Sequence, residues 1–229
     1  LVDTIDLHGS QATTMTLANS SDDVLSGSEN DSALMDSAKS LLIGTSDSKI
    51  LVWTKTGTSA SKMESISLHE SDASKFESSS GGAGCTGSLP FEIVVTSIHC
   101  TQDNWWIIAG ICRNKKSTNR TILATLHGST RTLISHKVLR ETIHGIHYQS
   151  QSSRLYTIAN EGVVSVWDSP YRLELLQRLW SSSPSGRAVV NIGSSSRVAV
   201  AGIGSKIDVF ENACRIQSLL VDDNSTSSS

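Results

Sequence analysis

The sequence predicts an all-β protein built from many short strands. Its apolar runs are brief and rich in β-branched residues, as in 41–43 (LLI), 122–126 (ILATL) and 207–210 (IDVF). Gly, Ser, Asn or Asp residues bound each run, and such regular spacing with turn signals is typical of a sandwich, barrel or propeller. Only the stretch 171–180 (YRLELLQRLW) has helical amphipathicity. It is short and uncapped, so an outer strand fits it as well.

Composition and charge exclude several classes of protein. The 229 residues include 42 Ser and 19 Thr, 18% are charged, and the net charge is −3. No run approaches 18 apolar residues, so no transmembrane helix is expected. Mild acidity argues against direct nucleic-acid binding, which needs a basic stripe. The four cysteines form no C-x-x-C pair, and no secretory signal is visible. We therefore expect reduced thiols and an intracellular protein, cytoplasmic or nuclear.

Three segments of the sequence align without gaps. They are 45–54 (TSDSKILVWT), 159–168 (ANEGVVSVWD) and 202–211 (GIGSKIDVFE). Each begins with a small or polar turn and ends in a strand with Val before an aromatic residue. Candidate first strands near Ile98, Ile143 and Val189 lie 45 and 46 residues apart. A period of about 40–45 residues with four strands per unit indicates a β-propeller.

Residues 143–168 (IHGIHYQSQSSRLYTIANEGVVSVWD) resemble a WD40 half-repeat, with Trp167-Asp168 as the WD dipeptide. Glu161-Gly162 stand where the WD40 family prefers Asp-Gly, a pair that allows a tight turn with positive φ. The resemblance implies that the terminal aromatic residues anchor adjacent blades. It also implies a buried polar network around an Asp six residues before each aromatic. The corresponding pairs are Asp47 with Trp53, Glu161 with Trp167, and Gly204 with Phe210.

The resemblance implies four blades within residues 1–221, spanning about 11–69, 91–139, 142–180 and 188–221. Residues 1–7 (LVDTIDL) fit the outer strand of a preceding blade. We expect mobile insertions at 19–40 and 71–88, both rich in Ser, Asp and Gly, and a disordered tail at 222–229. Since closed WD40 rings usually have seven blades, the chain is expected to be a fragment or a partial ring that closes on another chain. Another repetitive fold, such as an eight-stranded sandwich, is the alternative.

The sequence motifs predict no catalytic residue, cofactor site or metal site. His144 and His147 point to opposite faces of a strand and cannot share an ion. The glycines at 81–84 lack the Lys-Ser/Thr of a phosphate loop, and no G-x-S-x-G elbow occurs. Basic residues at 113–120 fit an exposed turn better than a phosphate contact. The segment 181–185 (SSSPS) is interpreted as a linker, with Ser183 as an alternative phosphorylation site.

The resemblance implies a non-enzymatic scaffold that mediates protein–protein interactions within a multiprotein complex. The expected partners are other proteins, with no membrane and no small-molecule substrate. The alternatives are a substrate-recognition subunit of an enzyme complex and a component of an RNA-processing assembly. The resemblance also implies partner contacts at Ser46, Asn160 and Ile203, each of which stands just before the position of the turn Asp. Trp106 is a further candidate. Trp105 and Trp106 are adjacent, so one is expected in the core, and the other between blades or exposed to a partner.

Overall fold

The computed structural model describes most of the chain, and all of its regular structure there is β-strand. The described residues are 10–19, 39–55, 62–69, 89, 92–113, 120–183, 186–193 and 195–221. The predicted strand at 1–7, the insertion at 71–88, nearly all of the insertion at 19–40 and the tail at 222–229 lie outside them. Within the described residues, no helix is long and apolar enough to span a bilayer.

The described strands form four antiparallel sheets, each built from four strands that follow one another in the chain. Sheet 1 contains β1 (Ala12–Asn19), β2 (Lys39–Thr45), β3 (Lys49–Lys55) and β4 (Lys62–Ser67). Sheet 2 contains β5 (Ile93–Cys100), β6 (Trp105–Cys112), β7 (Thr121–His127) and β8 (Thr132–Leu139). Sheet 3 contains β9 (Ile143–Gln149), β10 (Arg154–Ala159), β11 (Val163–Trp167) and β12 (Leu175–Trp180). Sheet 4 contains β13 (Gly186–Asn191), β14 (Arg197–Gly202), β15 (Lys206–Glu211) and β16 (Cys214–Leu220).

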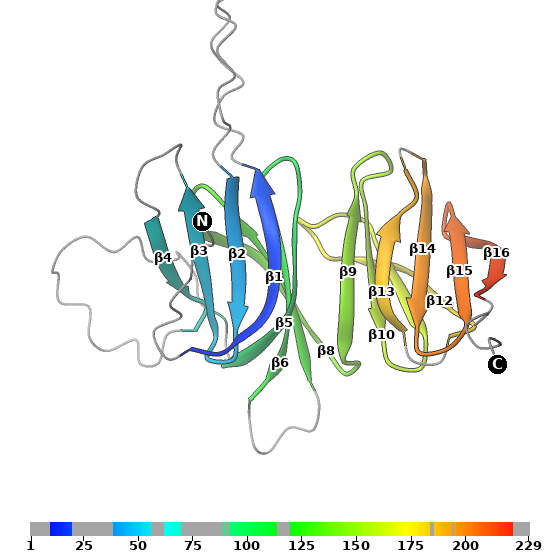
Figure 1. Ribbon diagram of the computed structural model, residues 1–229, viewed down its shortest axis with the longest axis horizontal. Coiled ribbons are helices and arrows are strands. Elements are labelled where there is room, and N and C mark those ends of the chain that lie inside the picture. Colours follow the sequence, from blue (N-terminus) through cyan, green and yellow to red (C-terminus); the bar gives the residue numbers. More distant parts are fainter. Residues whose placement is uncertain are drawn as a thin grey trace, which may run out of the picture.

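The first strand of each sheet lies on the inside of the array. Strand β1 contacts β5, β5 contacts β9, and β9 contacts β13. The four sheets therefore stand side by side around one axis, with sheets 1 and 4 at opposite ends of the row (Figure 1). This is the blade arrangement predicted from the repeat. The stretch 171–180 contains the outer strand β12 and no helix, in agreement with the strand interpretation.

The turn at Glu161-Gly162 has the conformation that the sequence predicts. Glu161 has a φ of 62° and Gly162 a φ of 70°, and the Val163 amide donates to the Asn160 carbonyl oxygen at 3.4 Å. Two successive residues with positive φ make a type I′ turn, which matches the twist of the strands that it joins. Glutamate adopts this backbone conformation only at some energetic cost, because its Cβ crowds the following carbonyl.

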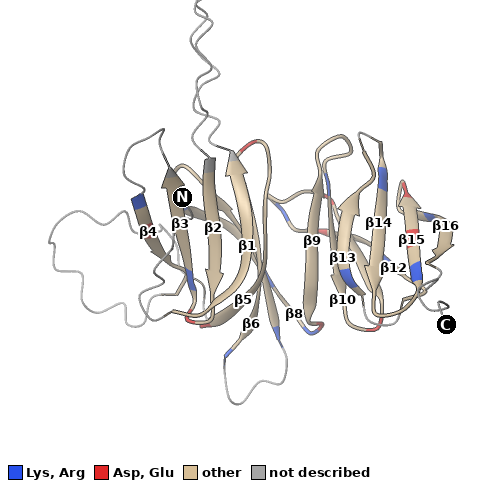
Figure 2. Cartoon of the chain, in the orientation of Figure 1, with Lys and Arg blue, Asp and Glu red and all other residues tan. Residues whose placement is uncertain are grey.

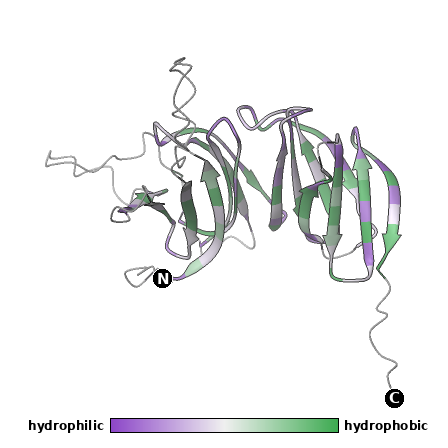
Figure 3. Cartoon of the chain, turned by 45° about the horizontal axis from the view of Figure 1, so that its top comes forward, coloured by the Kyte–Doolittle hydropathy of each residue, from purple (hydrophilic) through white to green (hydrophobic). Residues whose placement is uncertain are grey.

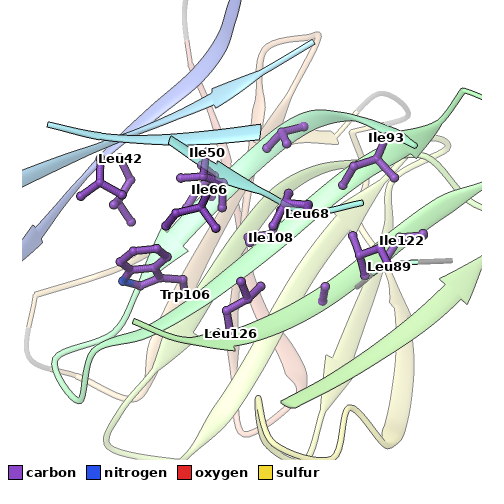
Figure 4. Packing of buried hydrophobic residues seen from close by; sticks show 14 of the residues in the cluster. Leu42, Ile50, Ile66, Leu68, Leu89, Ile93, Trp106, Ile108, Ile122 and Leu126 are labelled. Atoms are coloured by element: carbon purple, nitrogen blue, oxygen red, sulfur yellow. The ribbon is translucent and has the colours of Figure 1, made fainter. Parts of the chain in front are cut away.

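Apolar side chains fill the three spaces between neighbouring sheets. Trp106 and Ile108 of β6 pack towards sheet 1, whereas Ile107 and Ala109 of the same strand pack towards sheet 3. A strand that is covered on both faces is apolar at consecutive positions, which explains why the runs in the sequence do not alternate. Figure 4 shows the layer between sheets 1 and 2, where side chains of both sheets meet and Trp106 lies at one end of the cluster.

The aromatic ends of β11 and β15 anchor adjacent sheets, as the resemblance implies. Trp167 packs in the layer between sheets 2 and 3, and Phe210 packs in the layer between sheets 3 and 4. Trp53 pairs with Leu41 and is half-buried. It shares the face of sheet 1 opposite to the face that carries Leu42, which packs in the layer with sheet 2.

Both end faces of the array are apolar. On sheet 1, Met15 and Leu17 are 65% and 66% exposed and share a face with Trp53. On sheet 4, Val190 is 53% exposed and pairs with Ala199, which in turn pairs with Val209. Figure 3 shows hydrophobic bands on the strands of sheet 4. The outermost sheets therefore present the same kind of surface that is buried between inner sheets.

We predict that Gly162→Ala destabilises the chain strongly. An added Cβ would lie 2.9 Å from the Ser181 carbonyl oxygen and closer still to that of Ser183, at a φ of +70°. Backbone cannot yield to such a contact without moving β12, so the free energy of unfolding should fall by about 2–4 kcal/mol. Urea unfolding would measure the change.

Glu161→Gly in the same turn is the matched control. It removes the strain of a non-glycine residue at φ 62° and adds no atoms, so stability should rise by about 0.5–1 kcal/mol. A destabilised Glu161→Gly variant, or a Gly162→Ala variant as stable as the parent, would contradict this description of the turn.

Candidate functional site

The predicted partner contacts Ser46, Asn160 and Ile203 lie in the turns that join the second and third strands of sheets 1, 3 and 4. Because successive strands are antiparallel, these turns all lie at one edge of the array, the lower edge in Figure 1. We call it the turn edge. Ser46 is half-buried, Asn160 is exposed, and Ile203 is 61% exposed. The structure thus brings the three together on one edge, and their contact with a partner remains a prediction.

Hydrogen bonds from neighbouring segments hold each of these turns. The Ser46 amide donates to the Gln11 carbonyl oxygen at 3.0 Å, which ties the turn to the chain before β1. The Ser183 hydroxyl donates to the Ile203 carbonyl oxygen at 3.4 Å, which ties sheet 3 to the last turn of the edge. The side chains on the edge are therefore carried by anchored backbone.

A hydrogen-bonded relay fixes the side chain of Asn160. The Arg187 guanidinium donates to His144 Nδ1 at 3.4 Å, and His144 Nε2 lies 2.6 Å from Asn160 Oδ1. Since arginine only donates, Nδ1 must accept, and Nε2 then carries the proton that is donated to Asn160. A groove of about 230 Å³ lies beside this relay, with Arg140 and Glu161 in its wall.

Charges of both signs lie on the turn edge (Figure 2). Asp47 is the most strongly perturbed of them. Its partial burial favours the neutral acid, but hydrogen bonds from Lys49, Thr45 and Ser10 outweigh this and lower its pKa to about 2. Lys49 Nζ donates to Asp47 Oδ2 at 2.7 Å, and the Ser10 hydroxyl donates to the same oxygen at 3.1 Å. Asp47 therefore stays ionised and closes the turn onto the segment before β1.

Sheet 3 contains part of the polar network that the resemblance implies. The Trp167 indole N–H donates to the Thr157 hydroxyl at 3.0 Å in a buried position. Glu161, at the position of the family's Asp, is exposed in the turn. Asp168 stabilises the next loop, because its Oδ1 accepts hydrogen bonds from the amides of Ser169 (2.6 Å) and Glu174 (3.1 Å).

The structure corrects the proposal of Trp106 as a partner contact. Trp106 is 3% exposed and packs between sheets 1 and 2, which is the alternative that the sequence left open. Its indole N–H donates to Asn104 Oδ1 at 3.1 Å, and the Arg131 guanidinium lies 5.0 Å from the centre of its ring. The adjacent Trp105 is the more exposed of the two, and its ring lies edge-on to that of Tyr171 at 4.5 Å.

A buried carboxylate that sequence reasoning missed connects sheets 3 and 4. Asp208 of β15 is fully excluded from solvent and accepts hydrogen bonds from the hydroxyls of Ser181 (2.8 Å), Ser182 and Ser218. Burial alone would raise its pKa, but these hydrogen bonds and one from the Ser182 amide lower it. Arg215 adds an ion pair at 4.0 Å. The network holds the end of β12 against sheet 4.

The same network corrects the interpretation of 181–185 as a linker for residues 181–183, and residues 184 and 185 lie outside the described residues. Ser181 and Ser182 both bond to Asp208, and Ser183 is 2% exposed. A kinase has no access to a buried Ser183 hydroxyl in the folded chain. The only signal in the sequence was an acidic residue inside an otherwise apolar strand, IDVF, which the repeat pattern assigned to the variable position.

Groups with perturbed pKa values elsewhere are part of the packing. Burial and then the neighbouring His147 lower the pKa of His99 to about 4, and the two rings lie edge-on at 5.1 Å. Burial raises the pKa of the Cys100 thiol to about 11. Among the described residues, no group of three or more His, Cys, Asp or Glu side chains could hold a metal ion. What the blades offer on the turn edge is a set of hydrogen-bond donors and acceptors held in fixed positions.

Comparison with known proteins identifies the fold. No family model matches the sequence, and no curated protein matches it significantly. The β-propeller domain of Cps50 (Swd1) from Myceliophteria thermophila superposes with a TM-score of 0.55 at 11% identity, over 79% of this chain. The C-terminal WD40 domain of Sif2 superposes over 79% of the chain, with a TM-score of 0.51 and 13% identity.

The chain has the WD40 β-propeller fold. Raptor from Chaetomium thermophilum also superposes, with a TM-score of 0.63 at 11% identity, over 94% of this chain. The chain spans 57% of the Cps50 structure, 45% of Sif2 and 17% of Raptor. The four sheets are thus propeller blades, and the all-β fold class and WD40 resemblance predicted from the repeat are confirmed.

We predict that Asp208→Ala weakens the contact between blades 3 and 4 and so destabilises the chain. The substitution leaves the buried Ser181 hydroxyl without its acceptor and removes a charge-assisted contact, so the free energy of unfolding should fall by about 2–4 kcal/mol. Thermal and urea unfolding would measure it. Asp103→Ala, at an exposed turn, is the control and should change stability by less than about 0.5 kcal/mol. Equal losses in both variants would contradict the proposed role of Asp208.

We also predict that stability falls as the pH decreases from 6.5 towards 4. The unfolded chain binds a proton at His99 near its ordinary pKa of 6.5, whereas the folded chain does so only near 4. The contribution of the neutral His99 ring to the free energy of unfolding is therefore complete above pH 6.5. It is lost as the pH falls from 6.5 to 4. Between pH 6.5 and 4, the His99→Gln variant should lose about 1–3 kcal/mol less free energy of unfolding than the parent. Urea unfolding midpoints measured across this pH range test the prediction. If the parent and His99→Gln lose stability in parallel, the prediction is wrong.

Proposed function

We propose that this chain is a non-enzymatic protein-interaction scaffold whose turn edge binds partner proteins. The observation that carries the proposal is that three turns from separate blades present their side chains at one edge on anchored backbone. Ile203 offers an exposed apolar contact, and Asn160 offers a fixed amide in the preceding blade. A preorganised surface loses little entropy on binding, which favours recognition of another folded protein.

The chemistry of the edge supports a protein ligand. Arg140 and Arg187 lie near Asn160, and Glu161 borders the same groove, so the surface has both signs of charge, with Val163 as the apolar residue of the groove lining. That mixture is typical of a protein interface, in which an apolar centre is surrounded by a polar rim. The fold alone does not specify function, so the analogy with other WD40 propellers adds only general support.

The non-enzymatic part of the proposal rests on where the perturbed groups lie. His99 is held against His147 within the packing, and the Cys100 thiol stays protonated far above neutral pH. Catalytic acids and bases need pKa values near the working pH and access to a substrate. Burial explains the shifts of His99 and Cys100, and hydrogen bonds keep Asp47 ionised, so none of the three has a pKa near neutral pH.

We predict that charge introduced on the turn edge removes partner binding and leaves the fold intact. Ile203→Glu and Asn160→Arg alter an exposed apolar side chain and an exposed amide, so neither should lower the unfolding midpoint by more than a few degrees. Affinity purification of the intact protein with quantitative mass spectrometry would measure partner recovery. Stable partners should fall by about tenfold or more in both variants.

Gln102→Arg is the matched control, because Gln102 is exposed in the turn between β5 and β6 at the opposite edge. It should retain every partner that the parent protein recovers. The proposal fails if the parent recovers no stable partner, or if charge at Ser46, Asn160 and Ile203 leaves recovery unchanged.

A further inference from the structure

A second groove lies between blades 3 and 4 at the edge opposite the turn edge. Its volume is about 390 Å³, and it is bounded by the turns β9–β10 and β15–β16 together with strand β12. Arg154 and Tyr156 of β10 lie in its wall, and Val166, Leu176, Gln177 and Ala213 provide much of the remaining lining. Nothing in the proposed scaffold role accounts for this groove.

The Arg154 guanidinium is a cation without a partner in the part of the chain that the structure describes. It is half-buried at the start of β10, and no described carboxylate forms an ion pair with it. Arg131 and Arg178 do have carboxylate partners, Glu64 at 3.0 Å and Glu141 at 2.8 Å, whereas the exposed Arg140 and Arg172 have none among the described residues. The groove therefore has a net positive wall.

Tyr156 supplies a second unused donor. It is 2% exposed, and its ring packs with Val166 and Phe210 in the layer between blades 3 and 4. The described residues form no hydrogen bond with its hydroxyl, which is not among their fully buried unpaired polar atoms and therefore faces the groove that Tyr156 lines. Burial raises the pKa of Tyr156, an effect that Arg154 only partly offsets, so the hydroxyl stays protonated and can donate.

Together these groups fit a carboxylate flanked by apolar side chains. A carboxylate offers one oxygen to the guanidinium and one to the hydroxyl, and charge-assisted hydrogen bonds of this kind are the strong ones. A phosphate dianion would need further cations, and Arg154 is the sole charged side chain in the lining. Leu176, 50% exposed on the outer strand β12, lies beside the donors and offers an apolar contact.

We propose that this groove binds an acidic residue within an extended, apolar segment of a partner protein. The carboxylate of the segment lies between the Arg154 guanidinium and the Tyr156 hydroxyl, and neighbouring apolar side chains pack on Leu176 and Ala213. Strand β12 is the last strand of its sheet, so its free edge can align an extended segment along the groove. The groove and the turn edge lie at opposite ends of the blades, so the two proposals can fail independently.

Selection from random-sequence peptides displayed on phage tests the proposal with the full chain. Peptides retained by the parent protein but not by Arg154→Gln should be enriched in Asp or Glu next to Leu, Ile, Val or Met. A retained peptide, labelled with fluorescein, is then compared with its counterpart in which Gln replaces the acidic residue. Fluorescence polarisation should show about tenfold weaker binding for the Gln peptide, and a similar loss for Arg154→Gln.

The Tyr156→Phe variant distinguishes a direct loss of peptide binding from a loss caused by misfolding. The ring that packs in the core is kept and the hydroxyl has no described partner, so the unfolding midpoint should be unchanged while binding weakens by about three- to tenfold. Arg172→Gln, an exposed arginine in the loop before β12, controls for general charge and should bind normally.

Any one of the following results would overturn the proposal. The first is a selection in which the parent protein retains no peptides beyond those retained by Arg154→Gln. The second is a retained set with no enrichment in carboxylates. The third is equal binding of the acidic peptide and its Gln counterpart, or an equal loss in the Arg172→Gln control.

Discussion

Apolar contact between one sheet and the next determines the architecture of this chain. An isolated four-stranded sheet with two apolar faces cannot remain folded in water, so each blade depends on its neighbours to cover it. Trp167 and Phe210 are large side chains buried at two of the three interfaces, and each packs its own blade against the preceding one. Packing on both faces also explains the continuous apolar runs of the sequence.

Polar contacts then fix how neighbouring blades are aligned. The Ser48 hydroxyl bonds to both the amide and the carbonyl of Ile93, which links blades 1 and 2 (2.7 and 2.9 Å). The Thr96 hydroxyl reaches the Ile143 carbonyl oxygen at 3.3 Å between blades 2 and 3. Asp208 has the same role between blades 3 and 4. Apolar layers tolerate sliding, whereas directional hydrogen bonds do not, so these residues define the register that aligns the turns.

The fold was largely predictable from the sequence, because turn residues and strand periodicity are local properties. Glu161-Gly162 and the aromatic ends of β11 and β15 marked the repeat, and the structure has the expected turn and anchors there. The sites were less predictable, because they depend on contacts across blades. Adjacent tryptophans could not show which one faces a neighbour, and Trp106 proved to be buried. Two donors of Asp208, Ser181 and Ser182, lie in another blade, in a segment that resembled a linker.

The succession of inner strands from β1 through β5 and β9 to β13 has a consequence for how the protein folds and opens. Each blade packs against blades that are adjacent in sequence, so the array behaves as a one-dimensional chain of coupled units. Such a chain can be assembled blade by blade as it leaves the ribosome, without waiting for a distant segment. A local opening at one interface therefore leaves the strand pairing inside every blade intact, which a fold with long-range pairing does not allow.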